Sequence, residues 1–410
     1  MTKLKTALLF FTALLTWTAF IIYGLTSGFL LRGITTDDSP AAFIAAAEEK
    51  LQEAYAGNMA MALLDDGEVV GTAYHSVAEE VTDSTAFLVA SLSKWVTAWG
   101  VFKLVETGQL DLDAPVDSYL TRWQLPASNF DNDEVTARRL LSHTAGLVDS
   151  LGYAGFKPGE PAQTLEASLT APADASWSDG AARVGIAPGD QFIYSGASYT
   201  LLQLLIEEIS GQRFQDFMAD QILEPLGMHH STFDRDKAHS GDLAQPYKTD
   251  GTLNVYDQFT ALAAASLYTT TGDIARFIQA NLGSNPVLSE ASLDAMYTAH
   301  AFIGDTGIHA LGPEIFARDG KGTFIHGHDG SGDALNTAAR INRETGEGIV
   351  VFVTGNYNYA SRMADYWIHW TTGIADFVVI MSNKNWLLTL LLAGYGVILV
   401  GGIVLARRKK

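Results

Sequence analysis

Two long apolar runs without charged residues stand near the ends of this 410-residue chain and limit how it can fold. The run at 386–406 is long enough to cross a bilayer as a helix, and four basic residues, 407–410, follow it. A buried core helix is the alternative. It is disfavoured because the run is apolar on every face and is closed by cations. We therefore interpret 386–406 as a C-terminal transmembrane helix with a basic cytoplasmic tail.

The N-terminal segment, residues 1–33, also favours a membrane anchor. Lys3 and Lys5 precede an uncharged run at 7–31, as in a signal peptide or an uncleaved signal anchor. The length of the run and the lack of an A-x-A-like cleavage site favour the anchor. Both terminal runs carry positive charge on their outer side, so the positive-inside rule places both termini in the cytoplasm. The middle of the chain is then expected in the periplasm or outside the cell, with the lipid bilayer as a partner.

The charge of the middle region limits its partners. All 46 acidic residues lie between Asp37 and Asp376, whereas seven of the 26 Lys and Arg residues flank the terminal runs. The remaining 19 basic residues leave the middle strongly acidic, which makes nucleic acid an unsuitable partner. The chain has no Cys, so disulfides add nothing to stability, and a domain of this size does not need them.

Strand patterns occur near both ends of the middle region, which we expect to be one domain at 41–375. Two apolar runs around Asp65-Asp66-Gly67 predict a β-hairpin, and short apolar or alternating runs from Thr323 onward predict antiparallel strands. A single sheet built from segments far apart in the chain follows from this pattern.

Helical patterns fill most of the remaining domain. Apolar spacing predicts helices at 41–57 and 360–371, and residues 110–313 are expected to be mainly helical. The fold class is therefore α/β (α+β): an antiparallel sheet flanked by helices, plus an all-helical lobe, with a cleft between the lobes for a site.

Ser91 and Lys94 are three residues apart at the start of a predicted amphipathic helix, which Gly108 is expected to end. A serine hydroxyl needs a base to become a nucleophile, and a lysine serves when burial and nearby positive character lower its pKa. The helix N-terminus supplies such character, and the Ser91 N–H can face a developing oxyanion. An S-x-x-K spacing alone is a weak signal. The alternative is that Ser91 caps the helix and Lys94 lies on the surface.

Tyr194 is expected on a loop just before a helix that starts near residue 198. A phenol between a lysine and a leaving group can relay protons as general acid or base. An ordinary half-buried tyrosine is the alternative.

A third candidate segment, Gly327-His328-Asp329-Gly330-Ser331, follows a predicted strand. Its glycines would let the backbone run close beside a substrate, and the Ser331 N–H could be a second oxyanion donor. His326 and His328 alternate on the same strand, but no third ligand stands at recognisable spacing, so we expect no metal and no other cofactor.

Together and in this order, these motifs resemble the serine β-lactamase and penicillin-binding-protein-like family, on its class C, D-aminopeptidase and esterase branch. Segments such as RRLLSHTAGL, DLDAPVDSYL and LEPLGMHHSTF look like that family's framework. The resemblance implies Ser91 as the acylated nucleophile, Lys94 as its base and Tyr194 as the tyrosine of a Y-x-N motif. It also implies that His328 and Gly330 form a K/H-x-G strand motif lining the cleft. For His143, in the SHTAGL segment, we expect a structural role.

Two departures from the family pattern affect the expected activity. Gly196 stands where the Y-x-N motif has asparagine, which removes an amide that helps hold the substrate and the lysine. His328 stands where true class C β-lactamases have lysine, which weakens the fixed positive charge for a substrate carboxylate. Turnover of β-lactams is therefore not the expected activity.

The sequence thus predicts a membrane-anchored serine hydrolase that acts through an acyl-enzyme on an ester, a D-amino-acid amide or a related small-molecule or peptide substrate. The predicted catalytic residues are Ser91, Lys94 and Tyr194, and the predicted substrate-binding residues are Gly196, His328, Gly330 and Ser331. A receptor or scaffold that binds cell-wall fragments without turnover is the alternative.

Overall fold

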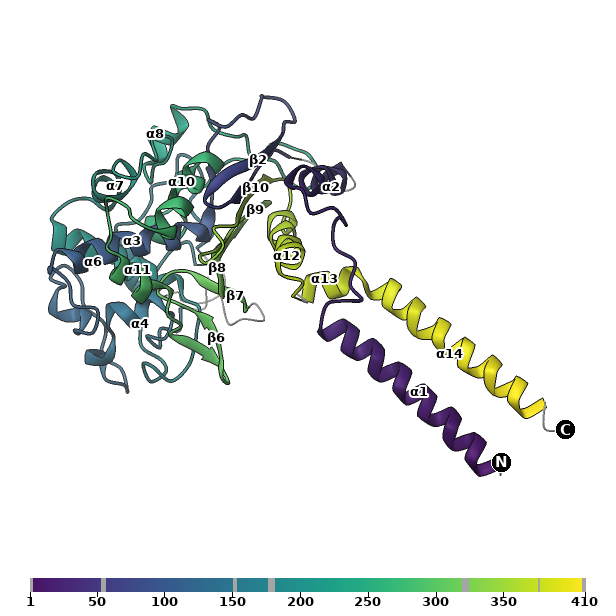
Figure 1. Ribbon diagram of the computed structural model, residues 1–410. Coiled ribbons are helices and arrows are strands. Elements are labelled where there is room, and N and C mark those ends of the chain that lie inside the picture. The colour runs from purple at the N-terminus through teal and green to yellow at the C-terminus, as the bar shows by residue number, and fades with distance from the viewer. Residues whose placement is uncertain are drawn as a thin grey trace. The chain divides into compact units, whose positions relative to one another are not determined.

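The computed structural model describes residues 3–52, 57–149, 153–175, 181–318, 324–374 and 377–407 (Figure 1). The chain forms two compact units. One contains Glu48–Ala364, and the other combines the two ends, Met1–Ala47 and Asp365–Lys410.

The larger unit contains an eight-stranded sheet in the order β2-β1-β10-β9-β8-β7-β6-β5, with every neighbouring pair antiparallel. The first strand of the domain lies beside the last, because Met59 pairs with Val353, and this confirms the single sheet predicted from distant segments. Its strands are β1 (Met59–Asp65), β2 (Glu68–His75), β5 (Ala301–Ile303), β6 (Thr306–His309), β7 (Glu314–Arg318), β8 (Phe324–Gly332), β9 (Leu335–Asn342) and β10 (Gly348–Thr354).

The predicted hairpin is present between β1 and β2. Asp66 and Gly67 both have positive φ, as the tight turn between right-twisted antiparallel strands requires. In the central strands β9 and β10 every residue is buried, so both faces of the sheet are covered. Helices α3 (Ser93–Glu106) and α10 (Thr271–Leu282) pack against strands of this sheet (Figure 1).

Helices and loops fill the chain between β2 and β5, as predicted. The longest is α6 (Gly196–Ser210), which ends at Gly211 in the left-handed conformation. The short strands β3 (Phe87–Leu88) and β4 (Tyr268–Thr269) pair with each other outside the main sheet. The remaining elements of this stretch are α4 (Ala137–Leu141), α5 (Leu165–Thr170), α7 (Phe214–Met218), α8 (Arg235–His239), α9 (Leu262–Ala265), α11 (Glu290–Tyr297) and the single turns η1 (Ala90–Leu92), η2 (Val116–Ser118), η3 (Asn132–Glu134) and η4 (Ala219–Leu223).

Two expectations from the sequence need correction. The C-terminal group of strands begins with β5 at Ala301, not near Thr323, because β5 and β6 are too short to give a visible alternation. Helix α3 is not amphipathic: Ser93–Phe102 are all buried, because the helix runs through the interior of the unit.

Helices at the two edges of the domain also match the predicted positions. The helix expected at 41–57 is α2 (Pro40–Gln52), and residues 53–56 of that prediction lie outside the described residues. The helix expected at 360–371 is α12 (Tyr359–Thr372).

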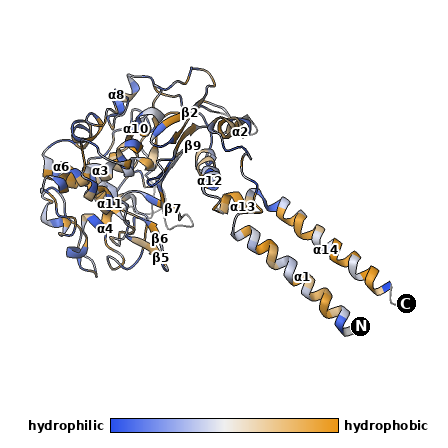
Figure 2. Cartoon of the chain, viewed as in Figure 1, coloured by the Kyte–Doolittle hydropathy of each residue, from blue (hydrophilic) through white to orange (hydrophobic). Residues whose placement is uncertain are grey.

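The smaller unit contains two long terminal helices, α1 (Lys3–Thr26) and α14 (Lys384–Arg407). The short helix α13 (Phe377–Ser382) directly precedes α14. Both long helices are long and apolar enough to cross a membrane, and Figure 2 shows their hydrophobic colouring. Most of their surface is exposed, with only 11% and 6% of the most apolar windows buried, so neither is a core helix. Of the predicted basic tail, only Arg407 lies within the described residues.

Specific contacts join α1 to α14. Trp17 Nε1 donates to the Leu391 carbonyl at 3.2 Å, and the hydroxyls of Thr18 and Tyr395 lie 2.7 Å apart. Near the other ends of the helices, the Asn383 side chain accepts from the Arg32 N–H at 2.9 Å and donates to the Arg32 carbonyl at 3.0 Å.

Candidate active site

Ser91 lies in the single turn η1, directly before α3. The preceding residue, Ala90, has φ +47°, a conformation that costs energy for a residue with a side chain and that is found where surrounding contacts enforce it. Those contacts are present at Val89. Its N–H donates to the Leu267 carbonyl at 2.9 Å, and its carbonyl accepts from Thr337 Oγ1 at 2.8 Å.

Gly330 also fixes this turn, through its lack of a side chain. A Cβ atom at position 330 would lie 2.1 Å from the Val89 carbonyl oxygen and 2.3 Å from Thr337 Oγ1. The sequence predicted that the glycines of this segment let its backbone run close beside a bound substrate. In the structure, strand β8 approaches the turn that carries Ser91.

Lys94 points back toward Ser91 from the first turn of α3. Its Nζ lies 3.0 Å from Ser91 Oγ and donates to the Ala264 carbonyl at 2.7 Å. The side chain is buried, with the residue 3% exposed. Burial lowers the Lys94 pKa to about 7, against the smaller opposite effects of Glu314 and Asp149. A large fraction of this amine is therefore neutral near pH 7 and can accept a proton, and the surface position considered for Lys94 is excluded.

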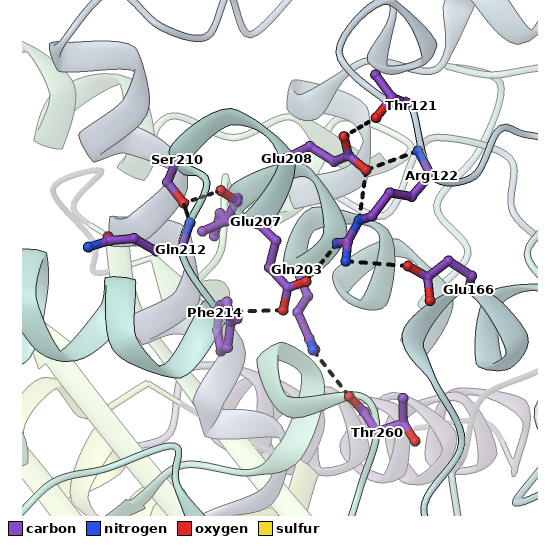
Figure 3. Close-up of polar contacts among 11 residues, drawn as sticks. Thr121, Arg122, Glu166, Gln203, Glu207, Glu208, Ser210, Gln212, Phe214 and Thr260 are labelled. Atoms are coloured by element: carbon purple, nitrogen blue, oxygen red, sulfur yellow. Dashed lines mark hydrogen bonds and ion pairs between the residues drawn. The ribbon is translucent and has the colours of Figure 1, made fainter.

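The Ala264 carbonyl is itself positioned by Gln203 on α6. Gln203 Nε2 donates to the Thr260 carbonyl at 3.2 Å, as Figure 3 shows, and its Oε1 accepts from the Ala263 N–H at 3.1 Å. One buried amide thus holds both ends of the segment that leads into α9.

Tyr194 occupies the predicted loop directly before α6, whose first turn is capped by the Ser195 side chain. Its hydroxyl hydrogen-bonds to Ser91, and Lys94 Nζ lies 5.1 Å from the centre of its ring. Burial, with Glu314 and Asp329 nearby, raises the Tyr194 pKa above its usual range, and the Ser91 hydrogen bond opposes this only partly. Tyr194 therefore carries its proton at neutral pH and can donate it.

His143 contacts three successive residues of the loop that carries Tyr194. The two rings stack with centroids 4.2 Å apart, and His143 Nδ1 accepts from the Ser195 N–H at 3.0 Å. The His143 carbonyl also accepts from the Ile193 N–H at 2.8 Å. These contacts agree with the structural role expected for His143.

A cavity of about 700 Å³ opens beside these groups. Five of the seven predicted site residues line it: Ser91, Lys94, Tyr194, Gly196 and Ser331. His328 and Gly330 are buried and are not on its wall, although the K/H-x-G motif was expected to line the cleft. Their predicted part in substrate binding stays a prediction, and their burial limits it to an indirect one.

His328 lies next to Tyr194 but away from the cavity wall, with the centres of the two rings 6.2 Å apart. Its Nδ1 is 2.6 Å from the Asp329 carbonyl and its Nε2 is 3.7 Å from Glu314 Oε1. Burial lowers the His328 pKa well below its usual value, and burial together with Asp329 raises the Glu314 pKa to about 8. Both side chains are therefore neutral near pH 7, and their contact is not an ion pair.

Gly196 begins α6 at the edge of the cavity, and the ring of Tyr153 lies where a side chain at this position would project. A Cβ atom at 196 would come within 2.8 Å of Tyr153 Cε2. The sequence showed that the asparagine amide is absent, and the structure shows that an aromatic ring takes its space.

A metal site finds no support here. Over the described ranges, no three His, Asp or Glu side chains gather in a way that could hold a metal ion. His326 bonds instead to the Tyr297 carbonyl at 3.0 Å.

Comparison with known proteins identifies the architecture around this site. The sequence profile of the beta-lactamase family matches residues 43–372, which is most of the chain. The chain belongs to the beta-lactamase family. This family is one of serine hydrolases, and penicillin-binding proteins are among the proteins that this chain resembles.

The relatives of this beta-lactamase family member are distant. The flp protein of Staphylococcus aureus (strain MW2) is 23% identical over 340 residues, which is 81% of this chain and 66% of that protein. The chain therefore spans slightly less than two thirds of the length of this relative. The putative penicillin-binding protein PbpX of Bacillus subtilis (strain 168) is 26% identical over 220 residues, covering 52% of this chain and 50% of its own length.

Solved structures share the fold. An octameric penicillin-binding protein homologue from Pyrococcus abyssi superposes with a TM-score of 0.69 at 25% identity, covering 81% of this chain and 77% of its own. A β-lactamase/D-alanine carboxypeptidase from Pseudomonas syringae superposes with a TM-score of 0.63 at 18% identity, covering 81% and 98%.

Several groups around the site were not predicted from the sequence. Gln203, Tyr153 and Glu314 reach it from segments in which the sequence shows no catalytic motif. Their positions depend on how α6, the loops and β7 pack, and the sequence gives no local signal for that.

Proposed function

We propose that this beta-lactamase family member hydrolyses acyl substrates through a covalent acyl-enzyme on Ser91. The observation that supports the proposal is the 3.0 Å separation between Ser91 Oγ and a buried Lys94 Nζ whose pKa is lowered to about 7. A neutral amine at that distance is a general base for the hydroxyl.

In the first step, Ser91 Oγ attacks the substrate carbonyl carbon while its proton moves to Lys94 Nζ. The backbone N–H groups of Ser91 and Ser331 donate to the oxyanion that forms. The bond to the leaving group then breaks, and the leaving group takes a proton from Tyr194, which is replenished from Lys94. The acyl group remains on Ser91 Oγ.

In the second step, a water molecule attacks the acyl carbonyl. The proton of this water moves to Lys94 Nζ. The bond from the carbonyl carbon to Ser91 Oγ then breaks, and Ser91 Oγ takes a proton back from Lys94. The products are a carboxylic acid and free enzyme, and the atoms balance without a cofactor.

Esters and D-amino-acid amides are the proposed substrates. The missing Asn amide at position 196, with the Tyr153 ring beside it, disfavours the way in which the family holds the amide of β-lactams. One structural neighbour is described as a D-alanine carboxypeptidase, so D-alanyl amides are the first peptides to test.

Hydrolysis of p-nitrophenyl acetate by the full-length protein in detergent tests the proposal. Many turnovers per molecule are expected from the wild type and a loss of at least 1000-fold from Ser91→Ala, since the nucleophile is removed. Equal rates for the two proteins would overturn it. Acylation that stops after one turnover would support instead a receptor that binds cell-wall fragments.

We also propose that α1 and α14 anchor the protein by crossing the bilayer together. Two exposed apolar helices would place a large apolar surface in water, which is unfavourable, whereas the hydrocarbon core of a bilayer solvates such a surface. The hydrogen bonds of Trp17 and Thr18 to α14 are of the kind that pairs helices inside a membrane. With both termini in the cytoplasm, the hydrolase unit would lie in the periplasm or outside the cell.

A further inference from the structure

Among the described residues, the charged side chains on the cavity wall are Lys94, Lys157, Asp257 and Asp333. Lys157 Nζ lies 2.9 Å from Asp257 Oδ1, so this pair neutralises itself. Lys94 contacts Ser91 and the Ala264 carbonyl inside the site. Asp333 is therefore the charge on the wall that the chain's own described residues leave uncompensated.

The contacts of Asp333 are with neutral groups. Asn254 Nδ2 donates to Asp333 Oδ2 at 3.2 Å, and the Tyr357 hydroxyl donates to Oδ1 at 3.4 Å. Asn254 and Tyr357 line the same cavity. They orient the carboxylate at the cavity wall and do not cancel its charge.

The carboxylate is also held close to the proposed reaction centre. Gly332 pairs with Leu335, so Asp333 and Ala334 form the tight turn between β8 and β9, and Ala334 has φ +55°. Asp333 is two residues from Ser331, which limits the separation of their Cα atoms to about 7 Å. Any substrate whose oxyanion meets the Ser331 N–H therefore lies near this charge.

His328 adds no positive charge to the described cavity wall, because its side chain is fully buried, is not among the lining residues and has its ring 6.2 Å from that of Tyr194. A substrate carboxylate would meet the uncompensated charge of Asp333 without a free cation on the described wall, and like charges are repelled.

We propose that Asp333 determines specificity by binding a cationic group of the substrate, an ammonium next to the carbonyl that Ser91 attacks. The inference rests on the proposed acyl-enzyme function and names the substrate class that the site selects. Acyl groups with a free amine are preferred, neutral ones are accepted less well, and those with a carboxylate at the same place are rejected.

Three esters that share the D-alanyl core and carry a positive, neutral or negative group on the α-nitrogen test this inference. They are the methyl esters of D-alanine, N-acetyl-D-alanine and N-succinyl-D-alanine, followed with full-length protein in detergent by acid release at constant pH. The wild type is expected to show the highest kcat/KM for the free amine and the lowest for the succinyl ester.

Substitution of Asp333 should change this order through KM. In Asp333→Asn, the ratio of kcat/KM between the free amine and the N-acetyl ester is expected to fall about fivefold, as for one partly exposed ion pair. Asp333→Lys should favour the succinyl ester. Asp305→Asn makes the same charge change at an exposed turn away from the cavity and should leave the ratio at the wild-type value.

The outcomes separate this inference from the proposed function. Hydrolysis that depends on Ser91 but shows no charge preference, or the same preference in Asp333→Asn, would overturn the role of Asp333 alone. A wild-type preference for the succinyl ester would overturn it and point to Lys157. Hydrolysis of all three esters that persists in Ser91→Ala would overturn the proposed function itself.

Discussion

The ring of Tyr153 and the backbone of Gly196 lie so close that a Cβ atom at 196 would stand 2.8 Å from Tyr153 Cε2. Asparagine at this position, as in the family motif, therefore cannot be accepted without movement of the ring. We expect Gly196→Asn to lower the free energy of unfolding by about 1–3 kcal/mol, as other overpacked sites do, and to slow ester hydrolysis. Denaturant unfolding and steady-state rates measure the two effects.

Removing the ring should reverse this loss. The double variant Tyr153→Ala/Gly196→Asn is expected to be more active than Gly196→Asn alone, because the asparagine then has space beside Tyr194. If the two substitutions proved simply additive, the ring and residue 196 would not compete for that space.

The pH dependence of kcat/KM should follow the ionisation of Lys94. Burial lowers the Lys94 pKa to about 7 in the folded protein, so the neutral base is scarce below that pH and abundant above it. We expect kcat/KM for a neutral ester to rise about tenfold per pH unit below pH 7 and to level off above it. A profile that is flat from pH 5 to 9 would contradict the assignment of Lys94 as base.

Glu314 provides a control for this profile. Its charge raises the Lys94 pKa, and its own pKa is raised to about 8. Because Glu314 is neutral below pH 7, Glu314→Gln should leave the rising limb below pH 7 unchanged, and the two profiles should differ only near pH 8 and above, where Glu314 would otherwise ionise.

Gln203 should act on the rate through Lys94. Gln203→Leu removes the hydrogen bonds that hold the Thr260 carbonyl and the Ala263 N–H, and so loosens the carbonyl that binds Lys94 Nζ. We expect kcat to fall about tenfold with KM little changed, roughly 1.4 kcal/mol of transition-state stabilisation. The rising limb of the pH profile should also shift to lower pH, because a lost acceptor disfavours the charged amine.

A second glutamine in the same region separates this effect from a general loss of stability. Gln212 is exposed, bonds to Asp220 at 3.4 Å and lies beyond the C-terminal end of α6 (Figure 3). Gln212→Leu should leave kcat and the pH profile as in the wild type. A fall in kcat without a shifted profile in Gln203→Leu would indicate a purely structural role.

The paired helices predict that α1 remains part of the mature protein. The hydrogen bonds of Trp17 and Thr18 with α14 need both helices, and the Asn383 side chain, directly before α14, bonds to the backbone of Arg32, which follows α1 in the chain. The mass of the intact protein from membranes should therefore include α1, and alkaline carbonate should not extract it. A mature N-terminus after residue 26 would contradict the helix pair.

Much of the fold could be read from local patterns. The hairpin at Asp66 and Gly67, the buried run of β10 and the helix after Tyr194 all have their signal in neighbouring residues. By contrast, α3 seemed amphipathic, since its pattern gives no sign that the helix runs through the interior and is buried on every side.

The candidate site divides in the same way. Ser91, Lys94 and Tyr194 belong to motifs, and the fold brings them together. Gly330 is required for another reason than the expected one, because its close neighbour is the Val89 carbonyl, 241 positions away in the chain. Contacts made only after folding, such as those of Tyr153 with Gly196 and Glu314 with His328, leave no local pattern to read.

The position of the covalent acyl group tests the catalytic role of Ser91 most directly. Full-length protein is mixed with an activated ester, quenched in acid, digested and examined by peptide mass spectrometry. One acyl group is expected, on the hydroxyl of Ser91, absent from Ser91→Ala and formed far more slowly in Lys94→Met. An acyl group on another residue, or product release by the wild type at full rate in Ser91→Ala, would contradict it.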